Sequence, residues 1–190
     1  VQELGGSYSS AAISGRVSLY ELELKDEIGF DSTTFANVNL PGTRRQGLET
    51  EVEVPLGRSL KLKLSYAYTD ATFREGVNNG KTLPLAPRDN TALQLSWDAG
   101  VAGRYAAIVN AVGDRRYSGD FANVRGTLAG YTTLDLRADW DFKPWQITAR
   151  VLNATDQRYA PFAGYSTFIA DHYYYPADGR SFYLGARYAF

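Results

Sequence analysis

Residues 60–68 read Leu-Lys-Leu-Lys-Leu-Ser-Tyr-Ala-Tyr, and this stretch decides the fold class. Leucine or tyrosine occupies every even position, while the odd positions carry Lys61, Lys63, Ser65 and Ala67. Successive side chains of a β-strand point to opposite faces, so this strict alternation predicts a strand with one apolar and one polar face.

The same alternation recurs along most of the chain. It predicts further strands near residues 48–56, 93–98, 104–111, 132–142, 145–151 and 181–190. A short strand near residues 2–9 and a less regular one between residues 13 and 28 bring the number to about nine. In the irregular segment Leu19 and Leu22 differ in parity, which predicts a β-bulge near Tyr20 or Glu21 that restores the facing.

The connections between these strands alternate in length. Short ones lie near residues 9–12, 57–58, 99–103 and 143–144, and long ones near residues 30–43, 73–88, 117–130 and 159–179. An antiparallel meander with all its long loops on one rim produces this spacing. Short turns on one side and long loops on the other are typical of outer-membrane barrels, so the pattern favours a membrane barrel over a soluble sandwich.

The alternation also predicts facing. We expect the apolar face to point to lipid and the polar face to point into a wet lumen, because unpaired charges are costly in a dry core. Opposite charges such as Glu51 and Lys63 can then pair across neighbouring strands. The residues expected to face outward are Leu62, Leu64, Leu134, Leu136, Leu184 and Ala186, and those expected to face inward are Glu51, Lys61, Lys63, Asp135, Arg137 and Arg187.

Composition excludes several function classes. With 20 Lys plus Arg against 21 Asp plus Glu, the chain lacks the basic excess of a nucleic-acid binder. It has no cysteine and one histidine, which excludes thiolate chemistry and a multi-histidine metal site within this chain. No nucleophile–base–acid set appears, so we expect no catalysis, no metal and no cofactor. Methionine is absent even at position 1, which indicates a chain processed or excised at its start.

Aromatic residues gather near the short turns. Trp97 precedes one short turn, and Trp140, Phe142 and Trp145 flank another. Together with Tyr188 and Phe190 at the C-terminus, they are predicted to form an aromatic belt at one membrane interface. The alternative is that these rings simply favour strands.

Several short motifs appear in an order that resembles one family. Val151-Leu152-Asn153-Ala154-Thr155-Asp156-Gln157-Arg158-Tyr159 is similar to the penultimate strand of TonB-dependent receptors, with Ala154 where leucine is usual. Residues 44–49 (Arg-Arg-Gln-Gly-Leu-Glu), 83–88 (Leu-Pro-Leu-Ala-Pro-Arg), 112–117 (Val-Gly-Asp-Arg-Arg-Tyr) and 179–182 (Gly-Arg-Ser-Phe) also match that family in order.

The resemblance implies a bacterial outer-membrane protein that takes up a metal chelate (a siderophore) or cobalamin. It also implies that the barrel assembly machinery reads the terminal Phe190. Such barrels have 22 strands around a plugged lumen. This chain has room for only the last eight or nine strands, and no plug domain is recognised in residues 1–190, which we expect to form a single barrel domain or barrel fragment.

Three arrangements follow from strand parity. Nine alternating strands have parallel ends and cannot close in the usual antiparallel way. The chain is therefore a fragment of a larger barrel, or eight strands from Ile13 onward close a small barrel. Such a stand-alone or engineered barrel would serve as scaffold, anchor or narrow pore, without active transport. In the third arrangement, copies of the chain associate edge to edge, because unpaired edges are untenable in lipid.

Candidate ligand contacts lie in and beside the long connections. An anionic chelate could meet Arg44, Arg45, Arg115 and Arg116, whose alternative role is to pair with nearby acids. The candidates in the longest loop are Tyr165, Phe168, His172 and Tyr173. Their rings could stack on a ligand or pack at the rim, and a lone histidine is poor evidence for metal binding.

Overall fold

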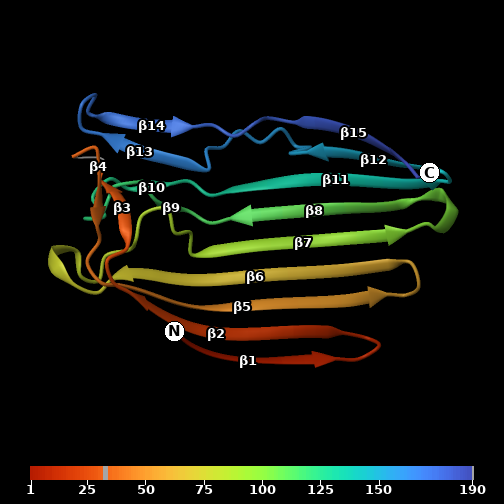
Figure 1. The fold of residues 1–190 in the computed structure, drawn as a ribbon, viewed down its shortest axis with the longest axis horizontal. Helices are drawn as coiled ribbons and strands as arrows, with labels where there is room; N and C mark the ends of the chain where they lie inside the picture. The colour runs from red at the N-terminus through yellow and green to blue at the C-terminus, as the bar shows by residue number, and fades with distance from the viewer. Residues whose placement is uncertain (32–33, 190) are drawn as a thin grey trace.

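Nine antiparallel strands form one continuous sheet (Figure 1) in a computed structural model that describes residues 1–31 and 34–189. The strand order is β1-β2-β5-β6-β7-β8-β11-β12-β15, so every strand lies beside its predecessor within the sheet. The bounds are β1 (Gln2–Ser9), β2 (Ser14–Leu24), β5 (Thr43–Leu56), β6 (Leu60–Phe73), β7 (Asp89–Asp98), β8 (Arg104–Val112), β11 (Tyr131–Phe142), β12 (Trp145–Leu152) and β15 (Ser181–Tyr188). The predicted all-β meander is confirmed.

All long connections emerge at one rim of the sheet, and the short turns lie at the opposite rim (Figure 1). We name the long connections loop A (residues 25–42), loop B (residues 74–88), loop C (residues 113–130) and loop D (residues 153–180). The predicted alternation of short and long connections is therefore confirmed.

The loops contain structure that the alternation of the wall strands did not predict. Loop A holds β3 (Ile28–Asp31) and β4 (Ala36–Asn39), and loop C holds β9 (Arg115–Arg116) and β10 (Thr127–Leu128). Loop D holds the hairpin of β13 (Phe162–Ser166) and β14 (Asp171–Tyr175), and loop B holds a helical turn, η1 (Gly76–Asn78). A second turn, η2 (Gly100–Ala102), lies between β7 and β8. Across the described residues we find no helix with the length and apolar character needed to span a membrane.

The strand register sorts the wall into two faces. One row across the sheet joins Leu62, Leu95, Ala107, Leu136, Val151 and Phe182, and the adjacent row joins Lys61, Ser96, Ala106, Arg137, Arg150 and Tyr183. Directly opposite residues of antiparallel strands share a face. Apolar and polar side chains therefore lie on opposite faces, as the alternation predicted.

The expected bulge near Tyr20 or Glu21 is wrong. The pairing of β2 with β5 runs without interruption from Ser14 opposite Glu53 to Leu24 opposite Thr43. Leu22 and Leu24 consequently lie on the polar face of the sheet. Near the long-loop rim this face is apolar, because Ala71 and Phe73 are buried there with Leu40 and Leu83 of loops A and B. Leu22 and Leu24 therefore lie on the opposite face from the other apolar wall residues, because loops A and B cover the polar face at that end of the sheet.

The alternative of an eight-stranded barrel closed from Ile13 onward is also wrong. β1 pairs with β2 along its whole length, so the first segment is a wall strand. The sheet of the described residues ends at β1 on one side and β15 on the other, and these two strands are not joined. Since nine strands alternate in direction, both edge strands run toward the short-turn rim (Figure 1).

Candidate functional site

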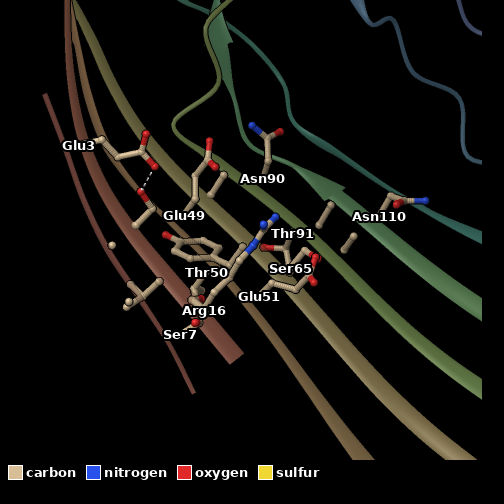
Figure 2. Close-up of a pocket in the computed structure, with 18 of the residues that line it drawn as sticks. Glu3, Ser7, Arg16, Glu49, Thr50, Glu51, Ser65, Asn90, Thr91 and Asn110 are labelled. Atoms are coloured by element: carbon tan, nitrogen blue, oxygen red, sulfur yellow. Dashed lines mark hydrogen bonds between the residues drawn. The ribbon is translucent and has the colours of Figure 1, made fainter. Parts of the chain in front are cut away.

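A hollow of about 670 Å³ lies on the polar, inner face of the wall, across β1, β2, β5, β6, β7 and β8 (Figure 2). Its charged lining residues are Glu3, Arg16, Glu49 and Glu51, and Arg16 lies directly across from Glu51 in the register. Small side chains such as Ser65 and Ala67 form part of its floor. The polar face of the wall is therefore hollowed, with charged side chains in the hollow.

Ion pairs cross the strands beside this hollow, and one of them includes its lining residue Glu51. Lys63 lies opposite Glu53 in the register, yet its Nζ pairs diagonally with Glu51 at 3.0 Å. Lys61 makes the parallel diagonal pair with Glu53 at 2.9 Å. All four side chains are more than a third exposed, so each pair adds at most about 1 kcal/mol to the stability of the fold. Their main effect is to place each positive charge beside a negative one on the exposed polar face of the wall.

Tyr20 crosses the inner face at Gly47. Its hydroxyl shares a 2.8 Å hydrogen bond with Thr69 Oγ1, two strands away. A Cβ at Gly47 would lie 2.8 Å from the Tyr20 hydroxyl and would collide with the Tyr68 carbonyl oxygen. The glycine of the Arg-Gln-Gly-Leu-Glu motif is thus required by close approach of a ring and a neighbouring strand.

Asn153 and Asp156 organise the start of loop D. Asn153 has φ of 49° and is 5% exposed; its Oδ1 accepts from Gln157 N at 2.9 Å and its Nδ2 donates to Gln157 O at 2.9 Å. Its backbone N–H donates to Asp135 Oδ1 at 2.8 Å, and Asp156 Oδ1 accepts from Arg180 N at 2.9 Å. These contacts explain the Asn and Asp of the motif at residues 151–159 as a turn that joins both ends of loop D.

Arg115 and Arg116 are held by loop backbone. Arg115 is 5% exposed, and its Nη2 donates to the carbonyl oxygens of Ala160 and Pro161, both at 2.8 Å. Its guanidinium also lies 5.5 Å from the centre of the Tyr131 ring. Arg116 Nη1 donates to Gly126 O at 3.1 Å. Arg115 therefore fastens loop D to β9, while Arg116 is the less enclosed of the two.

Arg44 and Arg45 lie on opposite faces of β5. Arg45 faces inward and makes a 2.6 Å ion pair with Glu27 of loop A. Burial raises the pKa of Glu27, but the hydrogen bonds from Arg45 and Thr43 outweigh it and hold that pKa below its usual value. Arg44 lies on the outer face, and among the described residues its buried Nε has no hydrogen-bond partner. The structure does not bring the two arginines into one site.

The loop D hairpin packs one face against loop C. His172 lies 4.2 Å from the Tyr117 ring and 5.3 Å from the Tyr165 ring, and the hydroxyls of Tyr117 and Tyr174 are 3.4 Å apart. Burial, together with the hydrogen bond to Tyr174, raises the pKa of Tyr117 to about 12, so it stays a neutral phenol. Tyr165 and His172 thus anchor the hairpin to loop C.

The other face of the hairpin is an aromatic patch, formed by Phe162, Tyr173 and Tyr175. The rings of Phe162 and Tyr175 are 5.3 Å apart and those of Tyr173 and Tyr175 are 6.0 Å apart. Tyr175 is 62% exposed, and Phe168 at the hairpin tip is 91% exposed. Partial burial raises the pKa of Tyr173. Of the candidates predicted in loop D, Phe168 is thus open to solvent and Tyr173 is partly exposed beside Tyr175.

The predicted belt residues lie together at the short-turn rim. The rings of Trp97 and Tyr105 are 5.4 Å apart, and Trp140 Nε1 donates to the Tyr105 hydroxyl at 3.2 Å. Trp145 lies 5.0 Å from Tyr188 and directly opposite Phe142 in the register. Phe190 lies outside the described residues. The contact of the predicted belt residues with a membrane interface stays a prediction.

The residues that connect the loops are not among those that the sequence predicts as functional. Tyr117 and Asn123 of loop C bond or pack against other loops, and Asp120 fixes the turn that carries Asn123, although none follows the period-two pattern. The Asp and Asn spacing in loop C is a turn signal that could have indicated Asp120 and Asn123. Nothing in the sequence alone indicated which loops they would join.

Comparison with known proteins agrees with this geometry. The family model described as TonB dependent receptor-like, beta-barrel matches residues 2–154. The ferrioxamine receptor of Yersinia enterocolitica is 26% identical over 170 residues, covering 80% of this chain and 23% of that protein.

Solved structures share the fold. The ferric yersiniabactin uptake receptor of Yersinia pestis superposes with a TM-score of 0.80 and 20% identity, covering 99% of this chain and 29% of that one. The ferric enterobactin receptor of Pseudomonas aeruginosa gives a TM-score of 0.78 and 22% identity, with 99% and 30% covered. The chain spans less than a third of the length of each of these relatives. The family model covers most of the chain, and on that ground the chain belongs to the TonB-dependent receptor family, within its β-barrel.

Proposed function

We propose that this chain is wall and outer-loop structure of a bacterial outer-membrane receptor that takes up a metal chelate. The observation that carries the proposal is the wall itself. Its inner face is polar and hollowed, and it ends at a rim of packed loops that present exposed aromatic rings. The relatives named for ferrioxamine, yersiniabactin and enterobactin support a ferric siderophore as the ligand, with cobalamin as the alternative.

Ligand contact is assigned to the open loop residues. Phe168, Tyr173 and Arg116 meet the chelate, since the two aromatic residues lie on or near the exposed patch and Arg116 is the less enclosed arginine. Arg45, Arg115, Tyr165 and His172 act by holding the loops, because their side chains already contact other loop segments. Arg44 faces outward and takes no part in ligand contact.

The test is binding to the full-length receptor that contains this chain. Purified receptor is titrated with ferrioxamine, ferric yersiniabactin, ferric enterobactin and cobalamin, and isothermal titration calorimetry reports binding. Replacing Phe168 and Tyr173 by alanine is expected to weaken binding of the recognised chelate by about tenfold. Asn79→Ala, in loop B and without a side-chain hydrogen bond among the described residues, is the matched control. Failure of all four probes to bind contradicts the proposal.

The partners of the wall follow from the same reading. The apolar outer face contacts lipid, the rim aromatics lie at the membrane interface, and the assembly machinery reads Phe190. Deleting Phe190 is expected to reduce the amount of folded receptor in the outer membrane far more than Asn79→Ala does. Equal amounts of the two variants would show that Phe190 has no role in assembly. The receptor performs transport and no catalysis, and it needs no cofactor of its own.

A further inference from the structure

The Asn123 side chain in loop C makes the pair of backbone hydrogen bonds that a neighbouring β-strand would make. Oδ1 of Asn123 accepts from the Thr82 backbone N–H at 2.8 Å, and its Nδ2 donates to the Thr82 carbonyl at 2.9 Å. Thr82 itself lies beside Thr72 of β6, where Phe73 N donates to Lys81 O and Leu83 N donates to Ala71 O. The backbone N–H and carbonyl of Thr82 are therefore both hydrogen-bonded by the side-chain amide of Asn123.

Asn123 is held rigidly on its own loop. Its φ is 57°, in the left-handed region, and its Nδ2 also donates to Asp120 O at 3.1 Å. The carboxylate of Asp120 is buried and accepts from Val124 N at 2.9 Å and Arg125 N at 3.1 Å. Phe121 packs against Phe73 with ring centres 5.7 Å apart. These contacts hold the turn at residues 120–125 in one conformation, apart from its hydrogen bonds to Thr82 of loop B.

The same stretch of loop C contacts loop D. Ser118 N donates to Ala163 O at 2.9 Å, and Tyr117 is buried with Leu128 and Ala163. The Arg125 guanidinium lies 3.7 Å from the centre of the Tyr165 ring. Loop C also joins loop B through Leu85 N, which donates to Arg116 O at 3.0 Å. Loop C therefore spans from loop B to loop D.

We propose that Asn123 is a positioning residue that couples loop B to loop C, and through the Tyr117–His172 packing to loop D, so that the three loops move as one body. Arg116 of loop C and the aromatic patch of loop D then keep a fixed separation. That consequence for chelate capture rests on the proposed function, while the coupling of the loops does not.

Hydrogen–deuterium exchange of the full-length receptor without any ligand tests the coupling. Asn123→Asp keeps the side-chain size but removes both N–H donors and sets a carboxylate against the Thr82 carbonyl. Asn123→Ala removes the amide altogether. In both variants we expect the amides of Thr82, Leu83 and Leu85 to exchange roughly tenfold faster, the scale of one lost hydrogen bond, and those of residues 117–118 and 163–165 to follow.

The controls separate coupling from local loosening. Asn79→Asp and Asn79→Ala, also in loop B, should leave all these amides unchanged, and the wall strands should exchange as in the parent receptor in every variant. Coupling is reciprocal, so His172→Ala, which frees loop D from Tyr117, should also speed exchange at residues 82–85. Faster exchange confined to residues 82–85 in the Asn123 variants, or no effect of His172→Ala on those residues, overturns the proposal. Because no ligand is present, the result stands whether or not a chelate binds.

Discussion

Gly47 shows how one residue sets the spacing of the wall. The Tyr20 ring and the Tyr68 carbonyl both lie within contact distance of the place where a Cβ would stand. Gly47→Ala is expected to lower the free energy of unfolding by about 1–3 kcal/mol, because the strand must shift or the Tyr20–Thr69 hydrogen bond must break. Thermal unfolding of the full-length receptor in detergent measures this loss.

Gly6→Ala is the matched control for that prediction. An added Cβ at Gly6 meets nothing within 4 Å, so the substitution should leave the unfolding temperature unchanged. Equal melting of the two alanine variants would show that the close approach at Gly47 has no energetic weight.

At the level of the element, loop A is fastened to β5 by the Glu27–Arg45 ion pair. The folded-state pKa of Glu27 lies below its unfolded value, so the pair stabilises the fold above the unfolded pKa. That stability is lost as pH falls through the folded pKa. Proteolysis of loop A by an acid-active protease should therefore accelerate as the pH falls below about 4.5, the unfolded value, in the parent receptor.

Glu27→Gln separates this ion pair from general acid effects. The variant should already be cut faster at neutral pH, and its cleavage rate should change less on acidification than that of the parent. A parent and variant with the same pH profile would remove Glu27 as the cause.

The facing of β6 gives a second test at this level. Leu64 lies on the apolar face opposite Val52, and Ser65 lies on the polar face opposite Glu51. Leu64→Arg places a charge against lipid and should cost about 2–4 kcal/mol if it lies near the bilayer midplane, so little folded receptor should reach the outer membrane. Ser65→Arg places the same charge beside an acid in the polar hollow and should assemble normally. Assembly of both variants in equal amounts would contradict the assigned faces.

The elements differ in how far the sequence predicts them. The wall strands could be predicted because period-two alternation is a local property, as in residues 60–68, and the register then follows from pairing with neighbours. The parity of Leu22 and Leu24 could not be predicted, since it depends on how loops A and B cover the rim around Phe73. The candidate arginines form a single group in sequence, but adjacent strand residues point to opposite faces, so Arg44 and Arg45 could not share a site.

At the level of the whole molecule, this segment alone should not perform active uptake. Driving a ligand against its gradient requires an element with two states that an energy source biases. The described residues form wall strands, turns and loops joined to them, with no separate body inside the hollow. Produced by itself in a receptor-deficient outer membrane, the chain should support no growth on ferrioxamine, whereas the full-length receptor that recognises that chelate should.

The direction of the edge strands decides how the wall can be completed. β1 and β15 both run toward the short-turn rim, so an antiparallel neighbour at either edge must run toward the long-loop rim (Figure 1). Two copies of this segment can meet that condition only if one is inverted, which would set their loops on opposite sides of the membrane. Insertion gives every copy the same orientation, so such a pair cannot form in one bilayer. A closed antiparallel ring therefore requires an odd number of strands of different sequence between β15 and β1, and these strands fix the circumference of the pore.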